Sequence, residues 1–434
     1  MTGFGVGRID GLSALLVPAI VAGAAVGCLL GAMGIARAHP LTPVSLQQLI
    51  DTTESGGTLT LPPAFYVGPA VVRRPMRIVA APGAILDGRG DGTVLTIEAD
   101  DVAVSGLLIR NSGDRNDGID AGLRLAGRRA VIEDNSFEDC LYGIRLEQAD
   151  DNIVRRNRIG SKDLPEARRG DAVRVWYSTG NLFEANEITG VRDGFGMQAV
   201  GNRLVANTVR DSRYGVQLLY GNANEIAGNR LLDNAVGIMA IASDDLLVTR
   251  NAIRSGRDVA GQAIILKDSS RALVADNDLF ANAVAIYLDA APVDADNPNR
   301  FRANRFTFNG TSVLLHADLT GNLFEDNVFR GNHAEVVVDG GGSALRNRWR
   351  GNDWDAFDGF DRDGDGIGDT AFEVWSWADR LWMDLPAAQL FRASPSLVLI
   401  DVVDRLASLT EPRLLLRDDA PRVPDRIETP ALVR

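Results

Sequence analysis

Asparagine recurs along this chain at a spacing close to 22 residues, and this repeat limits the possible folds more than any other feature. Each repeat reads Asn-x-apolar, and successive steps between residues 135 and 327 run from 21 to 29 residues. The asparagines in this register are Asn135, Asn157, Asn186, Asn207, Asn229, Asn251, Asn277, Asn304 and Asn327, and the series ends near Asn347 and Asn352. Repeats of this length are typical of a parallel β-helix, in which each turn of chain stacks on the next.

A second feature lies eight residues after most of these asparagines, where a small residue precedes a β-branched or apolar one. Examples are Gly143-Ile144, Gly215-Val216, Gly237-Ile238, Ala285-Ile286 and Ser312-Val313. Short stretches such as Ile144-Arg145-Leu146 alternate apolar and polar side chains, as strands do. The sequence therefore predicts an all-β, right-handed parallel β-helix of about ten or more rungs over residues 58–354. We expect asparagine to occupy left-handed corners and to bond amide to amide along the stack.

The N-terminus predicts export. Arg8 precedes an apolar stretch from Leu12 to Ile35, and Ala36-Arg37-Ala38 supplies a cleavage site. Residues 1–38 are therefore predicted to be a signal peptide, with a retained membrane anchor as the alternative, and the protein is expected to be periplasmic. Cleavage would leave Cys140 as the only cysteine, so no intramolecular disulfide is expected. Residues 39–57 are predicted to cap the first rung with a helix from Ser45 to about Thr53, starting at a capping box.

Charge and composition limit the partners. The formal charge is −13, with no basic block, which argues against nucleic acid as a partner.

Residues 355–373 predict a calcium-type loop. Asp361, Asp363, Asp365 and Asp369 stand at positions 1, 3, 5 and 9, with glycine at position 6. Position 12 is Phe372 rather than glutamate, so Asp355, Asp358 or Glu373 would have to complete the coordination shell. We predict structural Ca²⁺ bound by the four aspartates, fixing the end of the β-helix to its C-terminal tail.

Copper is the other metal considered. The soft or borderline ligands after residue 38 are His39, His316, His333, Cys140, Met76, Met197, Met239 and Met383. They are scattered, and each is more often structural.

Catalytic sets are incomplete, so we expect no enzyme. Asn116-Asp117-Gly118-Ile119-Asp120 resembles a run in β-helix pectin hydrolases, but no histidine lies between residues 40 and 315. Arg174 beside Asp171 or Glu147 resembles a lyase pair, although such pairs are common on surfaces. The alternative to a non-enzymatic protein is a polysaccharide-active hydrolase, lyase or epimerase.

Residues 374–434 form a Trp-rich C-terminal segment. It is predicted to be a helical extension, with an amphipathic helix from Ser394-Pro395 and a polar tail from Thr410. Aromatic and apolar side chains grouped in this way often mark an interface. The predicted docking residues are Trp375, Trp377, Trp382, Leu385, Leu390 and Phe391. Capping of the end of the β-helix is the alternative role.

Several segments together resemble the NosD family of nitrous-oxide reductase maturation proteins. They are Gly170–Ser178, Ser212–Gln217, Gly359–Thr370, Ala378–Pro386 and Phe391–Pro395. The rungs alone resemble the broader carbohydrate-binding and sugar-hydrolase β-helices.

The resemblance implies a periplasmic β-helix that docks on an ABC-type ATPase and permease and supports copper-centre maturation of nitrous-oxide reductase. It allows a copper-chaperone lipoprotein as a further partner. Family members often carry His and Met after a Tyr-Gly-Val, where this chain has Gln217 and Leu219.

Overall fold

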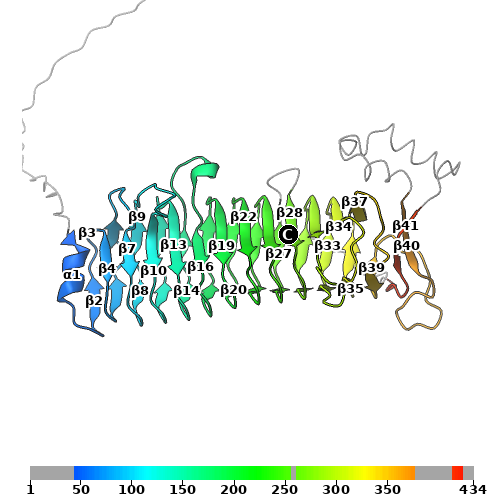
Figure 1. Ribbon diagram of the computed structural model, residues 1–434, viewed down its shortest axis with the longest axis horizontal. Coiled ribbons are helices and arrows are strands. Elements are labelled where there is room, and N and C mark those ends of the chain that lie inside the picture. The colour runs from blue at the N-terminus through cyan, green and yellow to red at the C-terminus, as the bar shows by residue number, and fades with distance from the viewer. Residues whose placement is uncertain (1–43, 256–260, 377–412, 424–434) are drawn as a thin grey trace, which may run out of the picture. The chain divides into compact units, whose positions relative to one another are not determined.

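The computed structural model describes residues 44–255, 261–376 and 413–423, and the predicted signal peptide lies outside them. Three long sheets, here called A, B and C, surround one apolar core, and each turn of chain gives one strand to B, then A, then C (Figure 1). Neighbouring rungs pair in parallel, as Val131 with Ile153 shows. The predicted parallel β-helix is confirmed. No helix among the described residues is long and apolar enough to cross a membrane.

Sheet A has 14 strands, and most expose charged side chains. Its strands are β1 (Val44–Ser45), β3 (Phe65–Val67), β6 (Ile85–Asp87), β9 (Leu108–Arg110), β12 (Ser136–Glu138), β15 (Arg158–Ile159), β18 (Glu187–Thr189), β21 (Thr208–Arg210), β24 (Arg230–Leu232), β27 (Ala252–Arg254), β30 (Asp278–Phe280), β33 (Arg305–Thr307), β36 (Val328–Arg330) and β39 (Asp353–Trp354).

Sheet B has 15 strands, of which the last two come from the C-terminal part of the chain. Its strands are β2 (Thr58–Leu61), β5 (Arg77–Ala80), β8 (Ala103–Ser105), β11 (Val131–Glu133), β14 (Ile153–Arg155), β17 (Leu182–Glu184), β20 (Arg203–Val205), β23 (Glu225–Ala227), β26 (Leu247–Thr249), β29 (Leu273–Ala275), β32 (Arg300–Arg302), β35 (Leu323–Glu325), β38 (Arg348–Arg350), β41 (Arg413–Asp418) and β40 (Phe372–Ser376).

Sheet C has 12 strands and, from β10 onward, contains the longest strand of each rung. They are β4 (Ala70–Val72), β7 (Leu95–Ile97), β10 (Ala121–Leu125), β13 (Tyr142–Glu147), β16 (Val173–Trp176), β19 (Asp193–Gln198), β22 (Tyr214–Leu219), β25 (Val236–Ile241), β28 (Gln262–Lys267), β31 (Val284–Asp289), β34 (Thr311–His316) and β37 (Ala334–Asp339). A short 3-10 helix, η1 (Glu166–Arg168), interrupts the rung between β15 and β16.

Helix α1 (Leu46–Thr52) covers the first rung with buried Leu46 and Ile50. The helix starts where the sequence predicts, but the Ser45 side chain makes no capping hydrogen bond. Gln47 instead satisfies the edge of sheet C: its Oε1 accepts from the Val71 N–H at 2.7 Å and its Nε2 donates to the Val71 carbonyl at 3.3 Å. The helix therefore caps an exposed strand edge as well as the core.

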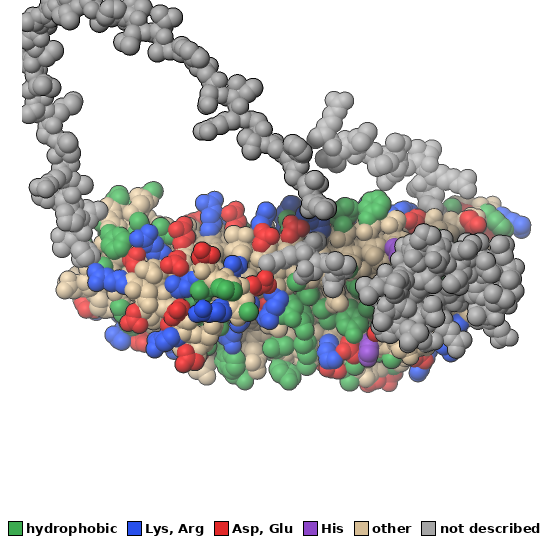
Figure 2. All heavy atoms as spheres, turned by 90° about the horizontal axis from the view of Figure 1, so that it is seen from above, with side chains coloured by type: hydrophobic (Ala, Val, Ile, Leu, Met, Phe, Trp, Pro, Cys, Tyr) green, Lys and Arg blue, Asp and Glu red, His purple; other side chains and the backbone are tan. Residues whose placement is uncertain are grey.

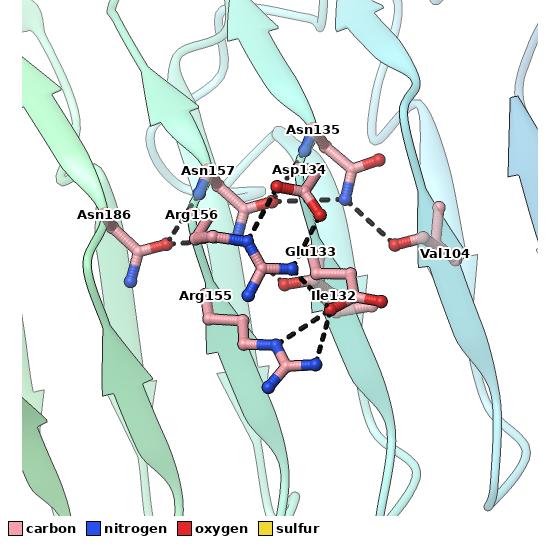
Figure 3. Close-up of polar contacts among 9 residues, drawn as sticks. All are labelled: Val104, Ile132, Glu133, Asp134, Asn135, Arg155, Arg156, Asn157 and Asn186. Atoms are coloured by element: carbon pink, nitrogen blue, oxygen red, sulfur yellow. Dashed lines mark hydrogen bonds and ion pairs between the residues drawn. The ribbon is translucent and has the colours of Figure 1, made fainter. Parts of the chain in front are cut away.

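The asparagine ladder occupies the corner between sheets B and A. In each rung the Asn Oδ1 accepts from the backbone N–H of the preceding Asn, and the side-chain amides also bond to each other: Asn157 Nδ2 donates to Asn186 Oδ1 at 3.0 Å (Figure 3). The amide stacking that the sequence predicts is present. The expectation that these asparagines adopt the left-handed conformation is wrong, because the residue before each one does so, such as Asp134, Arg156 and Ala185.

Ion pairs run along the outside of the same corner. Arg156 contacts Asp134 at 2.7 Å and Glu133 at 2.9 Å, and Arg155 contacts Glu133 at 2.7 Å (Figure 3). The hydrogen bond from Arg156 lowers the pKa of Asp134. These side chains are partly exposed, so we expect each pair to contribute little stability.

Aromatic rings fill the last rungs of the core. Phe324 stacks on Trp349 with ring centroids 4.0 Å apart, and Phe329 stacks on Trp354 at 4.1 Å. Phe372 of β40 extends the second stack, 4.7 Å from Trp354. The core therefore continues into the C-terminal part of the chain.

Strands β40 and β41 pair antiparallel, and β41 lies beside β38, the last rung strand of sheet B. The sequence predicted a polar tail over Arg413–Asp418, and this prediction is wrong. The Leu414-Leu415-Leu416 run, flanked by arginines, is a strand that buries Leu415 and Leu416. The predicted helix from Ser394-Pro395 lies outside the described residues.

Candidate functional site

The acidic loop, residues 361–369, is the place where the structure gathers possible metal ligands. Carboxylate oxygens of Asp361, Asp363 and Asp365 all lie within 4.8 Å of one another. Backbone N–H groups hold all three: Asp361 accepts from Gly364 at 2.7 Å and Gly366 at 2.8 Å. Asp363 accepts from the Asp365 N–H at 3.3 Å, and Asp365 accepts from the Ile367 N–H at 2.8 Å. Three carboxylates in this arrangement offer the oxygen ligands that Ca²⁺ prefers.

The pKa values of this loop reflect its crowding. Hydrogen bonds from backbone N–H groups, that of Gly366 first, lower the pKa of Asp361. For Asp363, the hydrogen bond from the Asp365 N–H lowers the pKa. The negative charge of Asp365, desolvation and the neighbouring Asp361 carboxyl outweigh this effect, so the pKa of Asp363 lies above its ordinary value. One carboxylate thus ionises easily while its neighbour is held back by like charge, and a cation would relieve that repulsion.

Asp369, the fourth predicted ligand, has a different role. Its Oδ2 accepts from the Arg362 N–H at 2.8 Å, so this carboxylate closes the loop and does not belong to the group of three. Two of the residues expected to complete the shell are also engaged elsewhere. Asp355 accepts from the Gly331 N–H, and Glu373 pairs with Arg417 at 2.9 Å.

The loop is attached to the end of the described chain. Gly368 N–H donates to the Pro421 carbonyl at 2.8 Å, and Val423 N–H donates to the Gly366 carbonyl at 3.1 Å. Gly368 packs so closely on Phe357 that an added Cβ would come within 2.3 Å of the ring. An ion that holds the loop in this conformation would therefore also stabilise the hydrogen bonds between the loop and residues 421–423.

Soft metal ligands do not gather among the described residues. Cys140 is buried and burial raises the pKa of its thiol to about 12, so it is not available as a thiolate. His316 is exposed and lies 4.0 Å from Asp339. Gln217 faces outward from β22 and pairs in register with Met239, without a histidine beside them.

Asp171, which was considered for catalysis, and the neighbouring Asp193 are held by arginines. Asp171 accepts from Arg192 at 2.7 Å and from Arg174 at 3.2 Å, and it is buried. Asp193, one rung further, is also buried and pairs with Arg213 at 2.6 Å. Both carboxylates are occupied by structural partners.

The Asn116–Asp120 run forms a turn. Asp120 pairs with Arg115 at 3.2 Å, and Tyr142 Oη donates to the Asn116 side chain at 3.2 Å. Asp117 is exposed, and its Oδ1 accepts from the Gly118 N–H at 3.0 Å. The turn interpretation of this motif fits these contacts.

Of the predicted docking residues, only Trp375 lies among the described residues. It is 40% exposed on β40, and its Nε1 donates to Glu373 at 3.1 Å. Trp377, Trp382, Leu385, Leu390 and Phe391 lie outside the described residues.

Sequence reasoning missed Asp418, which ends the asparagine ladder. Its Oδ2 accepts from Asn352 N–H at 3.1 Å, from Asn352 Nδ2 at 2.9 Å and from Trp354 Nε1 at 3.1 Å. The only sign of this role in the sequence is that an aspartate follows the apolar Leu414–Leu416 run. Asp418 lacks the 22-residue spacing that identified the asparagines of the ladder.

Comparison with known proteins places this chain in a family. Residues 156–359 match the family model described as "Periplasmic copper-binding protein (NosD)". A protein of Pseudomonas aeruginosa named "Probable ABC transporter binding protein NosD" is 27% identical over 88% of this chain and 91% of its own length. A second Pseudomonas aeruginosa protein of that name is 33% identical over 21% of this chain and 80% of its own length. This chain belongs to the NosD family. A NosD relative from Stutzerimonas stutzeri is 27% identical over 88% of this chain and 90% of its own length.

Solved structures support the fold of this NosD chain. The catalytic unit of the thermostable GH87 α-1,3-glucanase of Streptomyces thermodiastaticus strain HF3-3 superposes with a TM-score of 0.52. It is 13% identical, and the match covers 73% of this chain and 70% of the glucanase unit. At this identity the likeness concerns the β-helix alone and not the glucanase chemistry.

Proposed function

We propose that this NosD chain is a non-enzymatic periplasmic subunit that docks on an ABC-type ATPase and permease and supports copper-centre maturation of nitrous-oxide reductase. The observation that carries the proposal is the similarity, over 88% of the chain, to relatives named as ABC transporter binding proteins. The family description adds the periplasm and copper.

The docking surface in this proposal comprises Trp375 and the residues that follow it, up to about residue 410. Strands β40 and β41 hold both ends of this segment, because Trp375 pairs with Leu414. Aromatic side chains grouped in one segment are typical anchors of a protein interface. Trp377, Trp382, Leu385, Leu390 and Phe391 are the proposed anchors.

Copper is proposed to be handled together with partners rather than stored in this chain. The positions where relatives often have His and Met hold Gln217 and Leu219, and Cys140 is buried. A copper-chaperone lipoprotein is the proposed donor. Structural Ca²⁺ is proposed at Asp361, Asp363 and Asp365, with Asp369 shaping the loop.

The buried ion pairs of Asp171 and Asp193 favour this function over polysaccharide chemistry. An acid or base must reach the substrate, and these carboxylates contact arginines instead. Incubation with pectin or alginate should therefore release no product. Turnover that disappears in Asp117→Asn would support the enzyme alternative.

Genetic complementation tests the proposal. A host that reduces nitrous oxide and lacks this gene should contain nitrous-oxide reductase with depleted copper, and the intact gene should restore the copper content. Normal copper content in the deletion strain would contradict the proposal. A triple variant, Trp377→Ala/Trp382→Ala/Phe391→Ala, is preferable to truncation, because truncation would also remove β41 and Asp418 from the core.

A further inference from the structure

The outward side chains of sheet C change from charged to mostly apolar half-way along the β-helix. At one register position the early strands carry Arg124, Arg145 and Arg174. After Gly196, the same position holds Gln217, Met239, Ile265, Tyr287, Leu314 and Val337. We call these last six residues the outer strip. Outward positions of a solvated sheet are normally polar, so an apolar run there indicates a covered surface.

Neighbouring side chains widen the strip. Val236 and Val284 lie on one side of it and Leu219 and Ile241 on the other, all of them half-buried. Hydrophobic side chains accordingly gather on one face of the structure in Figure 2. The patch spans several rungs. It is therefore larger than the single apolar side chains that are scattered over most protein surfaces.

The chain's own C-terminal strand already covers one end of the strip. Leu415 of β41 and Val337 of β37 form a buried pair, and Leu314 and Ala334 pack against it. Leu416, the next residue, belongs to the main core on the opposite face of β41. The backbone is fixed here as well, since the Ala344 N–H donates to the Leu415 carbonyl at 2.8 Å.

Residues 397–412 directly precede this strand and have the length needed to continue the contact. The outer strip extends over five rung spacings, or about 24 Å at roughly 4.8 Å per spacing. Sixteen residues reach about 24 Å even at the rise of a helix, and further when extended. Leu397, Ile400, Val403 and Leu406 make this segment apolar. A second copy of the chain is a poorer occupant, since each copy carries a formal charge of −13.

We propose that residues 397–412 of the same chain pack on the outer strip of sheet C. The contact continues the one that Leu415 makes with Val337, and it leaves Trp377, Trp382 and Phe391 free for the docking proposed above. The inference concerns the chain's own surfaces and does not depend on the docking function.

Thiol accessibility in the full exported chain tests this contact. Ile265→Cys places a thiol in the middle of the strip, and Arg145→Cys places one at the same register position on the polar half of sheet C. The native Cys140 is buried with its pKa raised to about 12, so it should not react under native conditions. We expect maleimide to label Cys at 265 about tenfold more slowly than Cys at 145.

Charged substitutions in residues 397–412 provide a second test of the same contact. Ile400→Asp/Val403→Asp should raise the labelling rate at position 265 and leave the rate at position 145 unchanged. Three results would overturn the proposal: equal labelling at positions 265 and 145, no effect of the double substitution, or protection of position 265 that arises only when the membrane transporter is added. The last result would assign the strip to a partner protein.

Discussion

Asn207 shows how single residues hold the rungs together. Its side chain accepts from the N–H and Nδ2 of Asn186 at 3.0 and 2.9 Å and donates to Asn229 at 3.0 Å and to the Phe183 carbonyl at 2.9 Å. Asn186 Nδ2 has a second acceptor in the Val154 carbonyl, and Asn229 Oδ1 has a second donor in the Asn207 N–H, but the Asn186 N–H depends on Asn207. The repeat identified these asparagines from the sequence, and the Asn amide suits the position because it supplies both an acceptor and two donors.

Replacing Asn207 by alanine should lower the free energy of unfolding by about 2–3 kcal/mol, because it removes four buried hydrogen bonds and leaves the buried Asn186 N–H without its acceptor. The exposed Asn222, whose Oδ1 accepts one hydrogen bond from the Asp244 N–H, is the matched control, and Asn222→Ala should cost well under half as much. Denaturant unfolding of both variants measures the difference. Equal effects would contradict the role of the ladder.

Glu335 should make the stability depend on pH. Burial raises the pKa of Glu335 from 4.5 to about 7, although Ser312 Oγ donates to it at 3.0 Å. A raised folded pKa favours the protonated form, so this group's stabilising contribution is full below pH 4.5 and is lost as pH rises through 7. Glu335→Gln should therefore match the wild-type melting temperature near pH 4.5 and exceed it at pH 8. A constant difference at all pH values would contradict this assignment.

At the scale of elements, the end of the β-helix depends on a strand that is distant in sequence. Strand β41 places Asp418 at the end of the asparagine ladder, where it accepts from Asn352 and Trp354. The sequence repeat could not predict this contact, because 66 residues separate Asp418 from Asn352 and no spacing links them. The left-handed corners were misassigned for a related reason: many residue types adopt that conformation here, so composition does not identify the positions.

Asp418→Ala should lower the stability of the last rungs by about 3 kcal/mol, since it leaves buried donors of Asn352 and Trp354 without an acceptor. Rungs in a solenoid contact only their neighbours, so the loss should be local. Hydrogen exchange should speed up in β38 and β39 and stay unchanged in β5 and β8. Asp419→Ala, an exposed neighbour, is the control, and a uniform change along the chain would contradict the local role.

Calcium should stabilise the acidic loop. If the ion binds only the folded state, Ca²⁺ at 100 times its dissociation constant adds about 2.7 kcal/mol to stability, and the melting temperature should rise accordingly. Asp361→Asn should reduce this rise, whereas Asp296→Asn, an exposed acid between β31 and β32 and outside the loop, should not. A melting temperature that is the same with calcium and with chelator would contradict the site.

At the scale of the whole molecule, the β-helix provides three long faces, one for each sheet. The repeat alone predicted this architecture, because a spacing near 22 residues fixes the length of a turn. The proposed partner-binding role could not be derived from the rungs, since unrelated β-helices share them. The proposal is supported instead by the relatives, by the composition of the C-terminal segment and by the carboxylates that are held by arginines.

Direct binding to the transporter tests the central claim. The purified exported chain should bind the ATPase–permease complex reconstituted in nanodiscs, and Trp377→Ala/Trp382→Ala should weaken binding at least about tenfold, as expected for aromatic anchors. Tyr220→Ala removes an aromatic side chain that is 66% exposed on the β-helix and should leave the affinity unchanged. Absence of wild-type binding would contradict the transporter-linked function, and equal binding by the tryptophan variant would contradict the proposed docking surface.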